Sequence, residues 1–237
     1  MLLCRQFKIK RKDARMGLDN GLEKLVDGFN RFRKRYYERG HWLMEKLAHE
    51  GAHPDFLIIN CIDPRNGADI VFDAKPGQQF IQSEMAAIVP PYDPHEEPEI
   101  AASLGFAIES KKIKHLIIMA HTLCSGVEAL VNGTDDPYIA EWVKAAEPAK
   151  RAAIAAVGTA DKTALLRETE RQVVLMSLKN LLAYPMVKQA VAAGTLTVSG
   201  WLFDLAQGTL NEYQPEKKAF VQISKAGPIK QPRAPKP

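Results

Sequence analysis

The chain has 237 residues, of which 46% are hydrophobic and 25% are charged, as in an ordinary globular domain with a full core. Its formal net charge of +4 comes largely from basic clusters at the two ends, and no basic stripe interleaved with aromatic residues lies between them, so we expect no nucleic-acid binding. No apolar run approaches the ~18 residues that span a bilayer, so we expect no membrane segment.

The first periodic segment runs from Leu18 to about Ala48, where apolar residues recur at helical spacing and Gly40 divides the segment into two helices. Two short apolar runs, Phe56–Asn60 and His115–Ala120, then predict strands buried on both faces. The other expected elements are a strand at 79–81, helices at 99–110, 126–131, 137–150 and 164–182, a helix from Pro185 that ends at Gly194, and a last strand at 195–205.

Strands that alternate with helices indicate a mainly parallel sheet. We therefore predict an α/β fold with a mostly parallel central β-sheet flanked by helices and with an N-terminal helical arm. Residues 1–17 are a basic N-terminal arm, residues 18–214 form the main domain, and residues 215–237 are a C-terminal extension. The end of that extension is rich in Pro and Lys, and we expect it to be disordered.

The three cysteines are too few for a disulfide framework, which suits a reducing compartment. The first fifteen residues are basic but lack the apolar stretch of a secretory signal. We therefore expect a cytoplasmic protein. Cys4 lies in the basic arm and is expected to have no role, whereas Cys61 and Cys124 have quite different surroundings.

Two of the predicted strands end in residues that bind soft metals. Cys61 follows the first apolar run, and His121 with Cys124 follows the second. Ligands bind beyond the carboxyl ends of parallel strands, so adjacent strands would bring the three side chains to one edge of the sheet. Two thiolates and one imidazole suit Zn²⁺, and three protein ligands leave the fourth position open, as in catalytic zinc sites.

Each of these candidate site residues also has a simpler structural interpretation. A lone H-x-x-C is a weak signal, since a buried Cys often acts only as a small hydrophobe. The metal site is favoured because Cys61 lies at the matching end of another strand, followed by Asp63 and Arg65, which can pair beside the metal. The alternative for Asp63 and Arg65 is an ordinary loop salt bridge.

The two metal motifs resemble those of a known family. The run CIDPR (61–65) is similar to the C-x-D-S-R signature of the β-class carbonic anhydrases, and HTLC (121–124) is similar to their H-x-x-C. The stretches 76–80, 88–92, 105–108 and 177–210 agree as well, so the resemblance covers about residues 20 to 214 and makes the main domain β-carbonic-anhydrase-like.

The resemblance implies zinc-dependent reversible hydration of carbon dioxide to bicarbonate by a zinc-bound hydroxide, with the ion held by Cys61, His121 and Cys124. It also implies that Asp63 accepts a hydrogen bond from the hydroxide and that Arg65 holds Asp63 in place. It further implies a homodimer or a tetramer in which the helical arm packs across a partner subunit. Phe80 and Phe106 match positions that line the substrate pocket, although core packing is the alternative for either ring.

Several positions depart from the family pattern. Pro64 replaces the Ser of the signature, Ala52 replaces a Gln that contacts substrate, and the run 83–87 replaces an R-N-x-x-N segment. The altered pocket residues Ala52, Met85 and Ser125 keep open two alternatives: hydrolysis of a related heteroallene such as carbonyl sulfide or carbon disulfide, and a non-catalytic zinc-binding role.

A last departure concerns regulation. Some family members bind bicarbonate in a second pocket, which places the aspartate on zinc. The matching positions in this chain are Ile58, Ser83 and Phe203, which offer neither a cation nor a hydroxyl of comparable reach. We therefore expect no such closure, and Asp63 paired with Arg65 near neutral pH.

Overall fold

The computed structural model describes residues 20–38, 42–95 and 99–225. The basic arm at 1–17, with Cys4, and the Pro-rich end of the chain lie outside the described residues. The chain divides into two compact units, Met1–Gly51 and Ala52–Pro237, each of which is described by itself. No helix among the described residues combines the length and the apolar character needed to cross a membrane.

The first unit contains helix α1 (Asn20–Tyr36) and helix α2 (Leu43–Glu50), as the helical spacing predicted. Helix α1 carries an apolar face that is exposed to solvent in the single chain. Leu25 and Phe29 are 72% and 59% exposed on that face.

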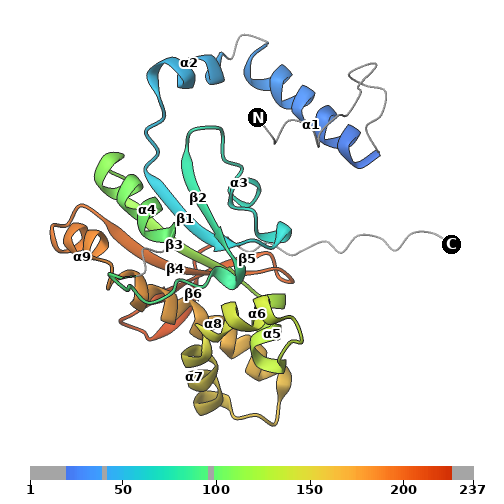
Figure 1. The fold of residues 1–237 in the computed structure, drawn as a ribbon, viewed down its shortest axis with the longest axis vertical. Coiled ribbons are helices and arrows are strands. Elements are labelled where there is room, and N and C mark those ends of the chain that lie inside the picture. The colour runs from blue at the N-terminus through green and yellow to red at the C-terminus, as the bar shows by residue number, and fades with distance from the viewer. Residues whose placement is uncertain (1–19, 39–41, 96–98, 226–237) are drawn as a thin grey trace, which may run out of the picture. The chain divides into compact units, whose positions relative to one another are not determined.

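The second unit is built on a sheet of six described strands in the order β2-β1-β3-β4-β5-β6 (Figure 1). The first four strands of this order are parallel to one another, and β5 and β6 are added in antiparallel fashion. The predicted α/β fold is therefore confirmed. The strands are β1 (Phe56–Cys61), β2 (Gln79–Glu84), β3 (His115–His121), β4 (Thr197–Asp204), β5 (Thr209–Gln214) and β6 (Ala219–Gln222).

Strands β5 and β6 were not predicted, because neither contains an apolar run and both are only partly buried at the edge of the sheet. Strand β6 also lies beyond residue 214, where the sequence placed the end of the main domain. Because β6 pairs with β5, the sheet continues further along the chain than that boundary allowed.

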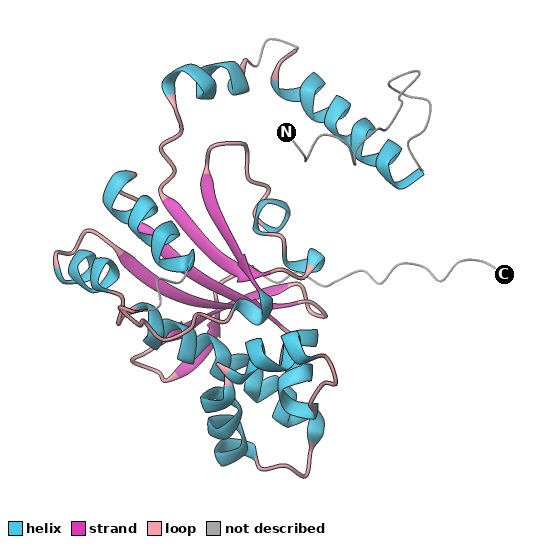
Figure 2. Ribbon diagram, in the orientation of Figure 1, coloured by secondary structure: helices cyan, strands magenta, loops and turns pink. Residues whose placement is uncertain are grey.

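Helices of the second unit flank the sheet, as Figure 2 shows. The single helix expected at 137–150 is in fact two helices, with a break at Ala145–Ala146. The helices of the second unit are α3 (Ala68–Val71), α4 (Glu99–Gly105), α5 (Ser125–Asn132), α6 (Pro137–Lys144), α7 (Glu147–Val157), α8 (Lys162–Leu181) and α9 (Pro185–Ala192), with a π-helical turn at Phe106–Ser110 and 3-10 turns at Pro64–Asn66 and Met85–Ala87.

Helix α8 packs against β3 and β4 and forms much of the support for the site described below. The approach is close because Gly200 in β4 has no side chain. A Cβ atom there would lie 2.4 Å from Leu178 Cδ1 and 2.7 Å from Val174 Cγ1, both on α8. Asp161 caps the start of α8 by accepting hydrogen bonds from two backbone N–H groups of its first turn.

Candidate metal centre

Strands β1 and β3 are neighbours in the sheet, and each ends in a metal-binding residue. Cys61 is the last residue of β1, His121 is the last residue of β3, and Cys124 directly precedes helix α5. All three side chains are buried, and their ligand atoms lie within 4.8 Å of one another. The structure thus brings together the three residues that the sequence singled out.

The ring of His121 is oriented for a ligand on one nitrogen. Its Nδ1 lies 2.8 Å from the carbonyl oxygen of Thr122, to which it can donate a hydrogen bond. That bond fixes the tautomer and leaves the lone pair of Nε2 free. Nε2 is buried and has no hydrogen-bond partner among the described residues. A buried acceptor without a partner is costly, and a metal ion would satisfy it.

The two thiols form a close, unequal pair, with 3.9 Å between Cys61 Sγ and Cys124 Sγ. The hydrogen bond from Cys124, assisted by His121, lowers the pKa of Cys61 to about 4. The same hydrogen bond, together with burial, raises the pKa of Cys124, because a second thiolate would stand beside the first. Cys61 is therefore a thiolate at neutral pH, and a bound divalent cation would favour ionisation of Cys124 as well. The donor set fits Zn²⁺.

Asp63 and Arg65 pair at the edge of this cluster. Arg65 donates from Nε to Asp63 Oδ1 at 2.9 Å and from Nη2 to Oδ2 at 2.7 Å. The hydrogen bonds from Arg65 lower the pKa of Asp63 to about 2. Asp63 Oδ2 also lies 3.8 Å from His121 Nε2, so an ionised carboxylate faces the ligand atoms. Pro64 fits here because Asp63 caps a 3-10 turn whose first residue is Pro64.

Two buried asparagines that the sequence analysis did not single out join the ends of β1 and β3. Asn60 donates to the carbonyl oxygens of Cys61 and Asn66, at 2.9 and 2.8 Å. Asn66 donates in turn to the carbonyl oxygen of Met119 at 3.1 Å. These bonds fix the loop that carries Asp63 relative to β3. Their only sequence signal was two amide side chains flanking the CIDPR run.

A further residue near the site, Glu170, was not predicted; it lies on helix α8 and is 1% exposed. Its Oε1 accepts a hydrogen bond from the backbone N–H of Cys124 at 3.2 Å. Burial raises the pKa of this carboxyl to about 6, although Arg167 opposes the rise. A signal was present, since Glu170 shares the helical spacing of the buried Val173 and Ser177.

The three expected pocket residues lie in two groups. Met85 belongs to the apolar cluster that contains Cys61 and Cys124, and its carbonyl oxygen accepts a hydrogen bond from Trp142 at 3.0 Å. The rings of Phe80 and Phe106 pack edge to face, with 5.8 Å between their centroids. In the single chain Phe80 packs against a different, larger cluster, and Phe106 is 51% exposed.

The fold and the cluster define a class: an α/β protein whose parallel strands carry two thiols and an imidazole to one edge, as in zinc enzymes. Comparison with known proteins identifies one family within this class. The carbonic anhydrase family profile matches residues 56–210. The chain belongs to the β-class carbonic anhydrase family, which is a family of zinc enzymes, and Cys61, His121 and Cys124 form a group able to bind the ion.

Individual relatives are distant but cover most of the chain. The sequence is 26% identical to β carbonic anhydrase 3 of Arabidopsis thaliana, over 84% of this chain and 79% of that protein. The structure of the β-carbonic anhydrase CcaA superposes with a TM-score of 0.79 at 25% identity, covering 85% of this chain and 99% of that one. One of two tetrameric β-carbonic anhydrases from Sordaria macrospora shares the fold, with a TM-score of 0.74 at 22% identity over 82% and 97% of the two chains.

Proposed function

We propose that this protein catalyses the reversible hydration of carbon dioxide to bicarbonate with a zinc ion held by Cys61, His121 and Cys124. The observation that carries the proposal is the ionised Asp63 carboxylate, which Arg65 fixes 3.8 Å from the free nitrogen of His121. A purely structural zinc site would be closed by a fourth protein ligand and would have no need of such a pair.

When bound, the zinc ion would supply a nucleophile at neutral pH by lowering the pKa of water to ~7. The residues of the chain do the rest. Asp63 would accept a hydrogen bond from the attacking oxygen and so orient its remaining lone pairs toward the carbon of the substrate. Arg65 donates to both carboxylate oxygens and also, at 3.1 Å, to the carbonyl oxygen of Leu123, which ties Asp63 to the loop of the second and third ligands.

Carbonyl sulfide or carbon disulfide is the second candidate substrate. It stays open because the pocket positions Ala52, Met85 and Ser125 depart from the family pattern. The side chains next to the metal-binding residues are apolar and suit any of these substrates. Ile62 and Leu123 are 60% and 51% exposed and each adjoins a metal-binding cysteine, while Met85 lies in the cluster with those cysteines. A third candidate, a non-catalytic zinc protein, is disfavoured by the retained pair of Asp63 and Arg65.

A stopped-flow assay of carbon dioxide hydration on protein of verified zinc content tests the proposal, with both sulfur substrates assayed in parallel. Hydration well above that of a Cys124→Ser sample supports carbonic anhydrase activity. Turnover of the sulfur substrates without hydration of carbon dioxide would support the second candidate function instead. No turnover of any of the three by zinc-loaded protein would leave the non-catalytic role.

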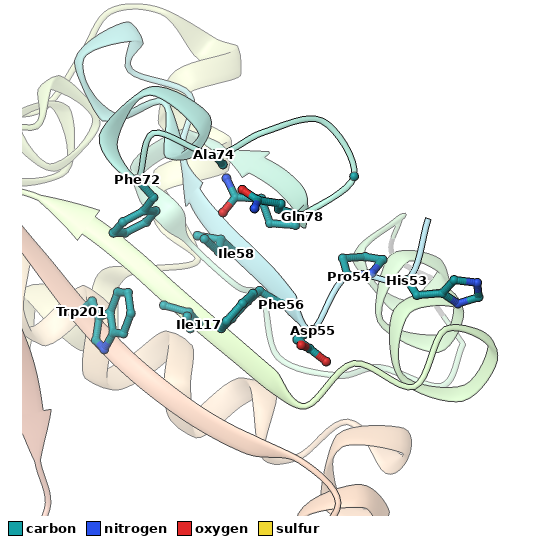
Figure 3. Close-up of a pocket in the computed structure, with 12 residues that line it drawn as sticks. His53, Pro54, Asp55, Phe56, Ile58, Phe72, Ala74, Gln78, Ile117 and Trp201 are labelled. Atoms are coloured by element: carbon teal, nitrogen blue, oxygen red, sulfur yellow. The ribbon is translucent and has the colours of Figure 1, made fainter. Parts of the chain in front are cut away.

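We also propose that the protein assembles as a homodimer or a tetramer. The cavity in Figure 3, of about 520 Å³, lies on the sheet face opposite α8 and is lined in part by Ile58, Phe72, Ile117 and Trp201. An apolar helix face such as that of α1, contributed by a second copy, would cover such a surface. The relative from Sordaria macrospora is described as tetrameric. Light scattering coupled to size exclusion, on wild type and on Phe29→Glu, checks this assembly.

A reducing, cytoplasmic location is part of the same proposal. It rests on Cys61 and Cys124, which are both free and which the site needs as thiols or thiolates. Fractionation of cells that express the tagged full chain would test the location.

A further inference from the structure

The turn between His121 and Cys124 has a strained backbone. Leu123 has a φ of 60°, in the left-handed region that residues with a Cβ atom rarely occupy. The conformation of Leu123 contributes to the direction in which the next residue, Cys124, leaves the turn. A turn of this kind persists only when its surroundings hold it. On one side, Arg65 holds the turn by donating to the carbonyl oxygen of Leu123.

Glu170 holds the other side. Its Oε1 accepts from the N–H of Cys124 at 3.2 Å. Since the N–H and the thiol of Cys124 share one Cα atom, the amide that Glu170 holds sets where Cys124 Sγ points.

The cost of burying Glu170 argues that it has a specific role. A buried carboxylate is unfavourable unless it is paired, and Arg167 pairs with it at 2.8 Å from the preceding turn of α8. Even so, a buried ion pair is often no more stable than an apolar residue of similar size. The other buried residues of α8 are uncharged, since four are apolar (Leu165, Val173, Val174 and Leu181) and two carry hydroxyl groups (Thr169 and Ser177). Packing alone therefore gives no reason for a charge at this position.

We propose that Glu170 is a positioning residue for the metal centre, acting through the backbone N–H of Cys124 to aim the Cys124 thiolate at the ion. The inference rests on the proposed zinc site but not on the identity of the substrate. It predicts that Glu170 is needed for tight metal binding even though it does not touch the metal.

The test compares Glu170→Leu, which removes the acceptor, with Glu168→Leu in the full chain. Glu168 is a matched control, since it lies on the same helix and also pairs with an arginine three residues away, Arg171, at 3.2 Å. Zinc affinity is measured by competition with a chromophoric chelator, and the thiolate-to-metal charge-transfer absorption is recorded with Co²⁺. Loss of a residue that orients a metal ligand commonly lowers metal affinity ~10–100-fold, which is the loss expected for Glu170→Leu, with a weakened cobalt band. Glu168→Leu should stay within about twofold of wild type.

A second variant separates positioning from general stability. Glycine adopts a positive φ without strain, so Leu123→Gly combined with Glu170→Leu should recover at least part of the lost zinc affinity. If Glu170→Leu does not fold, Glu170→Asp, which keeps the charge on a shorter side chain, should show an intermediate loss that Leu123→Gly also relieves.

The inference is overturned if folded Glu170→Leu binds zinc and cobalt like wild type, even with a lowered melting temperature. It is also overturned if Leu123→Gly restores no affinity to the Glu170 variant. Because neither readout uses a substrate, a protein that needs Glu170 for zinc yet hydrates no carbon dioxide would uphold this inference and refute the proposed function.

Discussion

Asp63 and Arg65 are joined at two points, Nε to Oδ1 at 2.9 Å and Nη2 to Oδ2 at 2.7 Å, while the backbone N–H of Arg65 donates to the same Oδ1. All of these bonds favour the ionised carboxylate, which is why the pKa of Asp63 falls to about 2. That this pair persists near neutral pH with zinc and bicarbonate present stays a prediction.

Asp63→Asn should therefore keep the metal and lose most of the activity. An amide fills the same space, but its NH₂ group cannot accept a hydrogen bond and would face Arg65. Removal of one oriented electrostatic partner commonly costs ~10²-fold or more in rate. The measurement is kcat of zinc-replete protein, with Asp161→Asn as control because Asn caps a helix as well as Asp does. Wild-type turnover in Asp63→Asn would show that the pair is only structural.

Cys124→Ser should abolish stoichiometric zinc binding, since a serine hydroxyl is a poor ligand for zinc. Cys61 and His121 would then be the only two good protein ligands left in the proposed set of three. Cys4→Ser, outside the described residues, is the matched control and should keep one zinc per chain. Elemental analysis of both purified proteins decides the matter. A full complement of zinc in Cys124→Ser would exclude the proposed ligand set.

Zinc affinity should rise with pH. The pKa of Cys61 is lowered to about 4, so this thiol is already ionised at pH 6, whereas the pKa of Cys124 is raised and its thiol keeps its proton. Burial alone lowers the pKa of His121, but its interactions with Cys61 and Thr122 raise it above the usual value. Zinc must displace the protons held by Cys124 and His121 in order to bind. For each proton displaced, zinc affinity should rise about tenfold per pH unit. Chelator competition at pH 6, 7 and 8 measures the slope, and a flat profile would contradict the assigned protonation states.

Gly200→Ala should destabilise the fold, because the new Cβ atom would meet Val174 and Leu178 at 2.7 and 2.4 Å. Overpacking of this kind typically costs about 1–3 kcal/mol. Gly105→Ala is the matched control. Gly105 is helical, a Cβ atom there would meet nothing within 4 Å, and replacement should be neutral or slightly stabilising. Urea unfolding of the two variants gives the comparison, and equal midpoints would mean that α8 can move away from β4.

Local chemistry explains which features could be predicted from the sequence. Strands β1 and β3 are continuous apolar runs that lead directly into Cys61 and His121, so both the strands and the metal-binding group followed from the sequence. Strands β5 and β6 have no such run, since their positions at the sheet edge leave them only partly buried. Their pairing depends on the turn after β4 and on tertiary contacts that the sequence does not display.

Glu170 shows a different limit. A glutamate in a long helix is normally solvated, and its neighbours in sequence, Glu168 and Arg171, are charged as well. Only the fold shows that α8 turns this one carboxylate toward the backbone of Cys124. The local sequence pattern therefore predicted the residues that would bind the metal. Glu170, which accepts a hydrogen bond from the backbone of Cys124, could be found only from the tertiary packing.

The most direct test of the central claim is the rate of carbon dioxide hydration, measured by stopped flow on full-length protein with one zinc per chain, near pH 8. We predict hydration far above the buffer rate. This activity should be lost when a chelator removes the zinc and should return when zinc is added back. Hydration at the buffer rate by fully zinc-loaded protein would contradict it.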